Sequence, residues 1–163
     1  MVGTLVAAEH PGLVRTLTVT GSGFSSAGYV PGAMEELVSL APDDGDMVMF
    51  AAMYARASPD GPDHFPEVWE KVRALWMEPF DWTAHIQRIE APTLVIVGDD
   101  DAVRVDHAQE FSCTVGNGQL AGVPGASHLV PMEKPDLFNQ LVPDFTAKPV
   151  PETMMPLRRQ ARG

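Results

Sequence analysis

The spacing of hydrophobic positions changes several times along the chain, and each change predicts an element. Short runs rich in aliphatic or β-branched residues, at 17–20, 94–97 and 120–123, are typical of strands. Elsewhere apolar side chains recur every three or four residues, which predicts helices over 1–9, 34–40, 46–57, 65–77, 81–86, 105–114 and 133–147. Pro143 lies within the last range, so we expect a kink or an early end there. Strands that alternate with helices indicate an α/β fold with about three parallel strands.

The same pattern divides the chain into four segments. Residues 1–23 are predicted to form a helix and a strand, and residues 91–147 to return to the alternation of strands and helices. Between them, Pro, Gly and Asp break residues 24–90 into short helical pieces, which predicts an inserted helical block. Residues 148–163 carry three prolines and then several arginines, so we expect a disordered tail.

Polar side chains follow two of the predicted strands at the point where each strand ends. Gly98 ends the second apolar run, and Asp99, Asp100 and Asp101 come directly after it. The third run is followed by a turn that ends at His128. Ligands of open α/β sheets bind at the carboxyl ends of the strands. These two turns are therefore the candidate functional site.

The two turns resemble the acid turn and the histidine turn of the α/β-hydrolase family. The first matches strand-Gly-x-x-Asp and the second matches Pro-Gly-x-x-His, through Gly98, Asp101, Pro124, Gly125 and His128. Residues 128–135 are similar to the start of that family's last helix. The resemblance covers the part of the fold that follows the nucleophile. It implies a partial α/β-hydrolase fold whose inserted helical cap spans residues 24–90.

The resemblance also implies chemical roles for two side chains. The triad of this family runs Ser, then Asp or Glu, then His along the chain. His128 is the implied general base, and Asp101 is the implied carboxylate that orients the imidazole and stabilises its cation. Asp99 and Asp100 remain alternatives to Asp101.

The nucleophile is the missing member of this set. No Gly-x-Ser-x-Gly occurs in the 163 residues. Residues 7–15 look like the end of the helix after the nucleophile elbow, so the resemblance places that elbow, and the oxyanion loop, upstream. Ser25 is the main internal candidate, because residues 23–27 imitate an elbow, and Ser22 is a second one. Residues 28–32 oppose the helix that an elbow needs, so we expect the chain alone to be inactive.

The implied function is that of a serine hydrolase, without a cofactor, acting on a small ester, lactone or similar acyl substrate. The fold does not separate this from thioesterase or C–C bond hydrolysis. Candidate pocket residues are Phe24, Met53, Trp69, Trp76 and Leu129. A simpler interpretation is that the Met and Trp side chains pack the core of the cap. The alternative function is a non-catalytic binding or interaction module.

Composition argues against several classes of binding partner and bears on the expected location. The net charge of −11 argues against nucleic acid and against an anionic membrane surface. A single cysteine excludes an intrachain disulfide, and no cluster has the spacing of metal ligands, so we expect no metal. His10, His64, His85 and His107 are predicted to be surface or capping residues. Without a long apolar span or a signal segment, the expected location is cytoplasmic. An unpaired sheet edge predicts self-association, such as a homodimer.

Overall fold

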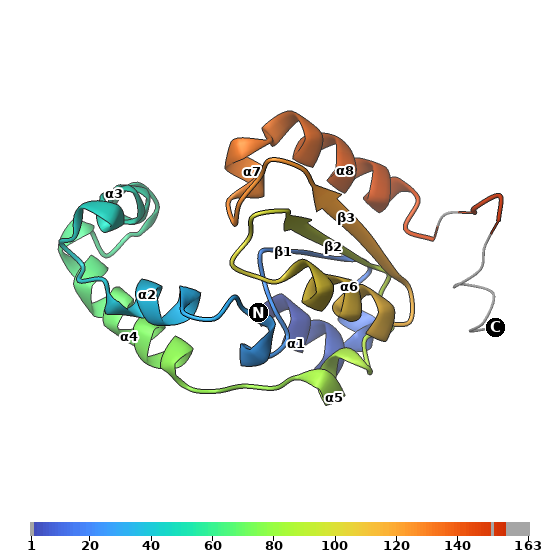
Figure 1. Ribbon diagram of the computed structural model, residues 1–163, viewed down its shortest axis with the longest axis horizontal. Helices are drawn as coiled ribbons and strands as arrows, with labels where there is room; N and C mark the ends of the chain where they lie inside the picture. Colours follow the sequence, from blue (N-terminus) through green and yellow to red (C-terminus); the bar gives the residue numbers. More distant parts are fainter. Residues whose placement is uncertain (1, 151, 156–163) are drawn as a thin grey trace. The chain divides into compact units, whose positions relative to one another are not determined.

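A three-stranded parallel sheet organises the part of the chain that carries the candidate site (Figure 1). The structure is a computed structural model that describes residues 2–150 and 152–155. The strands lie in the order β1 (Leu17–Thr20), β2 (Thr93–Gly98) and β3 (Gly118–Val123). All six residues of β2 are buried. This is the burial expected of a central strand with helices on both faces, and it explains the continuous apolar run in the sequence.

The chain divides into two compact units, and the sheet belongs to the unit of Met1–Val30 and Phe80–Gly163. Its helices are α1 (Val2–Glu9), α5 (Thr83–Ile86), α6 (Val105–Thr114), α7 (Val130–Glu133) and α8 (Pro135–Ala147). Helices α1 and α6 cover one face of the sheet and α8 covers the other (Figure 1). Alternate residues of β2 serve the two faces, because successive side chains of a strand point to opposite sides. Val95 and Val97 pack with Phe111 of α6, whereas Leu94 and Ile96 pack with Phe145 of α8.

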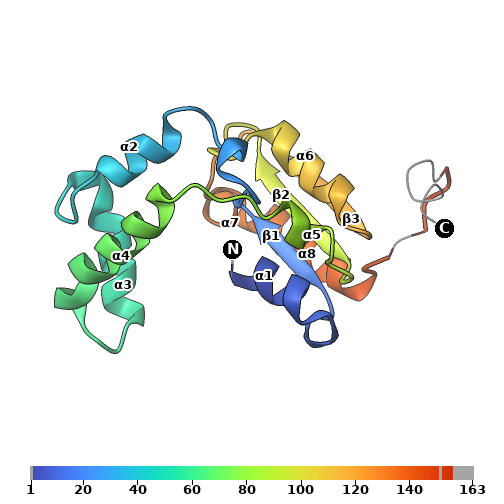
Figure 2. The ribbon, with the colours of Figure 1, turned by 90° about the horizontal axis from the view of Figure 1, so that it is seen from below.

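The second unit, Pro31–Pro79, is helical and has a core of its own (Figure 2). Its helices are α2 (Ala33–Ser39), α3 (Val48–Ala57) and α4 (Phe65–Met77). Four short 3-10 turns complete the helical elements within the described residues: Pro11–Leu13, Ser26–Gly28, Gly45–Met47 and Pro62–His64. Met47, Phe65 and Trp69 are buried in the core of the second unit, and Trp69 Nε1 donates to the carbonyl of Leu40 at 2.9 Å.

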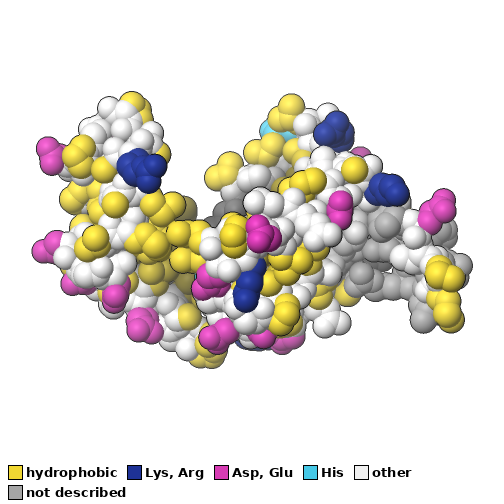
Figure 3. Space-filling model, turned by 90° about the horizontal axis from the view of Figure 1, so that it is seen from above, with side chains coloured by type: hydrophobic (Ala, Val, Ile, Leu, Met, Phe, Trp, Pro, Cys, Tyr) yellow, Lys and Arg dark blue, Asp and Glu magenta, His cyan; other side chains and the backbone are white. Residues whose placement is uncertain are grey.

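Hydrophobic side chains also lie on the surface of the second unit, as Figure 3 shows. The exposed ones on α3 and α4 are Val48, Met49, Phe50, Met53, Leu75 and Met77. Trp76, in contrast, packs edge-on against Trp69, with the ring centroids 6.1 Å apart. The amphipathic period of α4 thus builds a local core, as the simpler interpretation of the Trp residues states.

The second unit is shorter than the predicted cap, 24–90. Phe24, Ile86 and Ile89 are buried in the core beneath the sheet, with α1 and α6. Residues 24–30 and 80–90 therefore belong to the sheet unit. The Pro and Gly residues of these two segments mark connections rather than the limits of the inserted block.

Helix α8 continues through Pro143 and ends at Ala147, as the predicted range does. The early end expected at Pro143 is wrong, and the alternative, a kink, stays a prediction. Phe138, Leu141 and Phe145 pack against the face of the sheet lined by Leu94 and Ile96, and this burial holds the turn beyond the proline. Of the predicted disordered tail, 148–163, residues 151 and 156–163 lie outside the described residues.

Candidate active site

Asp101 and His128 lie in contact at the carboxyl ends of two neighbouring strands. Asp101 follows β2 and His128 follows β3, which pair in parallel, so both turns emerge at the same edge of the sheet. His128 Nδ1 lies 2.8 Å from Asp101 Oδ1. The structure thus selects Asp101 from the three consecutive aspartates. Asp99 and Asp100 are not hydrogen-bonded to the imidazole in the described part of the chain.

The carboxylate of Asp101 is fixed, whereas His128 reaches solvent. The Asp101 side chain is 0% exposed, and that of His128 is 47% exposed. Asp101 Oδ1 also accepts the N–H of Val103 at 2.9 Å, and Oδ2 accepts the N–H of Gly98 at 3.4 Å. With Nδ1 facing Asp101, Nε2 is the ring nitrogen left for a reacting group. This is the geometry of an oriented general base.

The two groups shift each other's pKa in opposite directions. Burial acts to raise the pKa of Asp101, but hydrogen bonds from His128 and from the amides of Val103 and Gly98 outweigh it. The net pKa of Asp101 therefore lies below its ordinary value. The hydrogen bond to Asp101 raises the pKa of His128, against the opposing effect of desolvation. The pair therefore favours an anionic carboxylate beside an imidazole that readily takes up a proton.

Two glycines, Gly98 and Gly21, make room for the turn that carries His128. A Cβ atom at Gly98 would lie 2.1 Å from the carbonyl oxygen of Ala126. A Cβ atom at Gly21, directly after β1, would lie 2.8 Å from His128 Cε1, and Gly21 has φ +57°. The ends of all three strands therefore meet around the imidazole. The signal in the sequence is a glycine at the end of an apolar run.

Ser25 does not form a nucleophile elbow. It is an extended residue that pairs with Asp81 in an isolated bridge, and a 3-10 turn follows it rather than an α-helix. No hydrogen bond joins Ser25 or Ser22 to His128 in the described part of the chain. Neither serine is therefore in a position to be activated by the base in this structure.

The predicted pocket residues have separate surroundings. Phe24 is 3% exposed and stacks on His107 in the core, so it does not line an open pocket here. Trp69 and Trp76 pack within the second unit, where Met53 is 52% exposed. Leu129 is half-buried and adjacent to His128. Contact of Met53 and Leu129 with a substrate stays a prediction.

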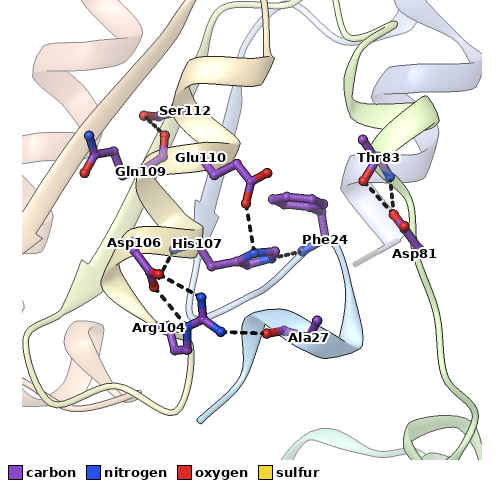
Figure 4. Close-up of polar contacts among 10 residues, drawn as sticks. All are labelled: Phe24, Ala27, Asp81, Thr83, Arg104, Asp106, His107, Gln109, Glu110 and Ser112. Atoms are coloured by element: carbon purple, nitrogen blue, oxygen red, sulfur yellow. Dashed lines mark hydrogen bonds and ion pairs between the residues drawn. The ribbon is translucent and has the colours of Figure 1, made fainter.

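His107 is buried, so its prediction as a surface or capping residue is wrong. Only 5% of it is exposed, and its Nε2 accepts the N–H of Phe24 at 3.2 Å (Figure 4). Gly23 and Gly28 leave the space that its ring occupies, since a Cβ at Gly28 would lie 2.1 Å from the ring. Desolvation lowers the pKa of His107, while Glu110 at 3.6 Å acts to raise it. His107 is therefore a structural acceptor that fastens the segment after β1 onto α6.

Arg104 fastens the same segment a few residues further on. Its Nη1 donates to the carbonyl of Ala27 at 3.1 Å (Figure 4). Its backbone N–H donates to the carbonyl of Gly28 at 2.9 Å. Asp106 holds the guanidinium through two hydrogen bonds, at 3.0 and 2.7 Å. The acid turn is thereby linked to the segment that leaves the sheet unit after β1.

The described residues hold no group of three or more His, Cys, Asp or Glu side chains that could bind a metal ion. Within the same part of the chain, none of the helices has the length and apolar character needed to cross a membrane.

Comparison with known proteins identifies the fold. No protein-family model matches the chain, and no curated protein matches its sequence significantly. Solved structures do match, among them a serine hydrolase involved in carbazole degradation, with 24% identity and a TM-score of 0.64 over 89% of this chain and 58% of that one. A meta-cleavage product hydrolase from Pseudomonas fluorescens has 19% identity and a TM-score of 0.62, over 89% and 60%.

An enol-lactonase from Burkholderia xenovorans also matches, with 20% identity and a TM-score of 0.56, over 89% of this chain and 61% of that one. The chain thus spans about 60% of the length of these enzymes. These likenesses, together with the three parallel strands flanked by helices, show that the chain has a partial α/β-hydrolase fold.

Proposed function

We propose that the chain provides the acid and the base of a serine hydrolase, and that the nucleophile comes from outside these 163 residues. The contact of 2.8 Å between His128 Nδ1 and the buried carboxylate of Asp101 is the observation that carries this proposal. A buried carboxylate fixes the tautomer of an imidazole and stabilises its cation, which is what a general base for acyl transfer requires. The solved hydrolases that share the fold support the same reaction class.

His128 acts twice in the proposed reaction. Nε2 removes the proton from the nucleophilic hydroxyl as its oxygen attacks the substrate carbonyl, and it then gives that proton to the leaving group. A water molecule repeats the sequence and releases the acid. Asp101 remains ionised throughout and stabilises the transient imidazolium. The raised pKa of His128 and the lowered pKa of Asp101 both favour this charge-separated arrangement.

The proposed substrate is a small ester, lactone or similar acyl compound. The fold hosts ester, lactone and C–C bond hydrolysis, so the fold alone does not decide among them. The enol-lactonase and the meta-cleavage product hydrolase among the similar structures favour testing lactones and meta-cleavage products beside simple esters. The reaction needs no cofactor, and we propose a cytoplasmic location.

The decisive assay uses the chain extended at its amino end by the in-frame sequence that precedes codon 1. A panel of nitrophenyl esters, lactones and meta-cleavage products would be hydrolysed by the extended protein. His128→Ala should lower kcat by about 10²–10⁴-fold, the usual contribution of a general base. His10→Ala is the control, because it removes an exposed histidine outside the candidate site. An unchanged kcat in His128→Ala would rule out the proposed role.

A second function, that of an interaction module, is favoured by the free edge of β1. Strand β1 pairs only with β2 in the described part of the chain. Leu17 donates its N–H to the carbonyl of Pro92, directly before β2, and Gly21 donates to that of Ile96 in β2. Because alternate N–H groups of a strand point to opposite sides, those of Thr18 and Thr20 point to the open edge. Unpaired edges of this kind accept another strand, including one from a second copy of the chain. Sedimentation analysis of wild type and Thr18→Pro tests this: loss of a dimer in the variant supports the edge as the interface, and a monomeric wild type excludes self-association.

A further inference from the structure

The turn that carries His128 is held by two carboxylates that do not belong to the Asp101–His128 pair. Asp99 Oδ1 accepts the N–H of Gly125 at 2.7 Å and that of Ala126 at 3.2 Å. The backbone of the acid turn adds two hydrogen bonds, from Asp99 N to the carbonyl of Val123 at 3.1 Å and from Asp100 N to that of Ala126 at 3.1 Å. The two turns are therefore joined by side chain and backbone together.

Glu133 of α7 holds the next residue. Its Oε2 accepts the N–H of Ser127 at 2.6 Å, and its Oε1 accepts the hydroxyl of Ser127 at 2.8 Å. These hydrogen bonds lower the pKa of Glu133. Together with Asp99, Glu133 satisfies the three consecutive backbone N–H groups that immediately precede His128, at Gly125, Ala126 and Ser127.

The position of His128 depends on this turn more than on its own packing. Its side chain is 47% exposed, so burial alone does not fix the imidazole. Asp101, in contrast, is held by burial and by the amides of Val103 and Gly98. Asp101 is thus fixed at the end of β2, whereas His128 lies on a turn whose backbone N–H groups donate to Asp99 and Glu133.

We propose that Asp99 and Glu133 are positioning residues that keep His128 within hydrogen-bond distance of Asp101. The importance of Asp99 and Glu133 for catalysis rests on the proposed function. The geometry itself can be tested without any turnover, in the 163-residue chain. Carboxylates suit this task because each offers two oxygens, and charge-assisted hydrogen bonds to backbone amides are about twice as strong as neutral ones.

The test is an NMR titration of the His128 Hε1 proton in wild type and variants. Asp99→Ala removes the acceptor, so the contact with Asp101 loosens and the pKa of His128 falls toward its ordinary value. Asp99→Asn keeps an acceptor oxygen without the charge and should restore most of the wild-type pKa. Asp100→Ala removes an equal charge from the adjacent residue, whose side chain makes no hydrogen bond in the described part of the chain, and should leave the pKa near wild type.

Two outcomes overturn the inference. One is an Asp99→Ala protein whose His128 titrates as it does in Asp100→Ala. The other is an Asp99→Asn protein that matches Asp99→Ala, because the effect would then be one of charge and not of position. Should Asp99→Ala fail to fold, Glu133→Ala decides instead, since Glu133 is exposed and its loss should also lower the His128 pKa. Failure of the proposed function is a separate result, namely a kcat unaffected by His128→Ala in the extended protein.

Discussion

Gly21 lies directly against the imidazole of His128, close enough that a Cβ atom at Gly21 would lie 2.8 Å from Cε1 and 3.0 Å from Nδ1. Gly21 follows β1, Asp101 follows β2 and His128 follows β3. The three strand ends therefore form one site, although these residues are separated by up to about a hundred positions in the chain. The chemistry depends on how closely the strand ends can approach one another.

Gly21→Ala should displace His128 from Asp101. The new Cβ would overlap the ring, and φ +57° is a strained backbone angle for alanine. We expect a loss of about 1–3 kcal/mol in the free energy of unfolding, together with a fall in the pKa of His128. Urea titration and NMR measure the two effects. Gly12→Ala is the control, because a Cβ at Gly12 meets no atom within 4 Å, and equal effects of the two changes would contradict this account.

Gly98→Ala should separate the acid turn from the histidine turn. The added Cβ would lie 2.1 Å from the carbonyl oxygen of Ala126 and 2.5 Å from that of Ser127, both of which are backbone atoms. Overpacking of this kind costs about 1–3 kcal/mol of stability. Gly122→Ala is a matched change in β3 with open space around its Cβ. A Gly98→Ala protein as stable as Gly122→Ala would show that the close approach of the two turns is unnecessary.

Loss of His107 should destabilise the chain through the backbone of Phe24. In His107→Ala the N–H of Phe24 loses its buried acceptor, which costs about 1–3 kcal/mol, and the ring stacked at 3.9 Å on Phe24 is also lost. His107→Gln tests the acceptor alone. Thermal unfolding that matches wild type in His107→Ala would contradict a structural role.

The lowered pKa of His107 also predicts how the stability of the chain changes with pH. The unfolded chain takes up a proton on this residue before the folded chain does. Stability should therefore fall as the pH decreases from the ordinary histidine pKa through the lowered folded one. The groups facing the ring are Glu110, Arg104 and Asp106 of its own segment and Asp81 across from it. The slope should disappear in His107→Gln, measured by urea titration between pH 4 and pH 8 (about the span of both carboxyl and histidine titrations).

The Asp101–His128 pair should lose stability at high pH as well as at low pH, and the loss at high pH is opposite in direction to the effect of His107. The raised pKa of His128 contributes stability that is present below its unfolded pKa and is lost as the pH rises through the folded pKa. The lowered pKa of Asp101 contributes stability that is present above its unfolded pKa and is lost as the pH falls through the folded one. The stability difference between wild type and His128→Asn should be largest at pH values above the unfolded pKa of Asp101 and below the unfolded pKa of His128. A difference that does not vary with pH would exclude the ion pair.

Periodicity predicted the bounds of the elements well where the apolar spacing is regular. The ranges of β1, α4 and α6 agree with the structure, because their apolar spacing is regular and turn residues limit them. The Gly-x-x-Asp resemblance favoured Asp101 but left Asp99 and Asp100 as alternatives. The structure decides between them, because the carboxylate of Asp101 contacts His128 and accepts the amides of Val103 and Gly98. Those contacts are tertiary and cannot be read from the spacing alone.

The burial of His107 was missed for a related reason. A histidine in an amphipathic helix is predicted to face solvent unless a partner for it is visible, and its partner is a backbone amide 83 residues earlier in the chain. The glycines that admit the ring, Gly23 and Gly28, are ordinary loop residues in the sequence. Similarly, Pro143 led to the expectation of a kink or an early end in α8. The helix continues to Ala147, because its apolar face packs on the sheet beyond the proline.

Labelling with a fluorophosphonate, followed by peptide mass mapping, tests the central claim most directly. The claim is that Asp101 and His128 serve a serine nucleophile that lies outside the 163 residues. The account predicts no label on the 163-residue chain, and a label on an upstream serine in the chain extended at its amino end. His128→Ala should slow that labelling by about 10²–10⁴-fold. A label on Ser25 in the 163-residue chain, lost in His128→Ala, would contradict the account, because the nucleophile would then lie within the chain itself.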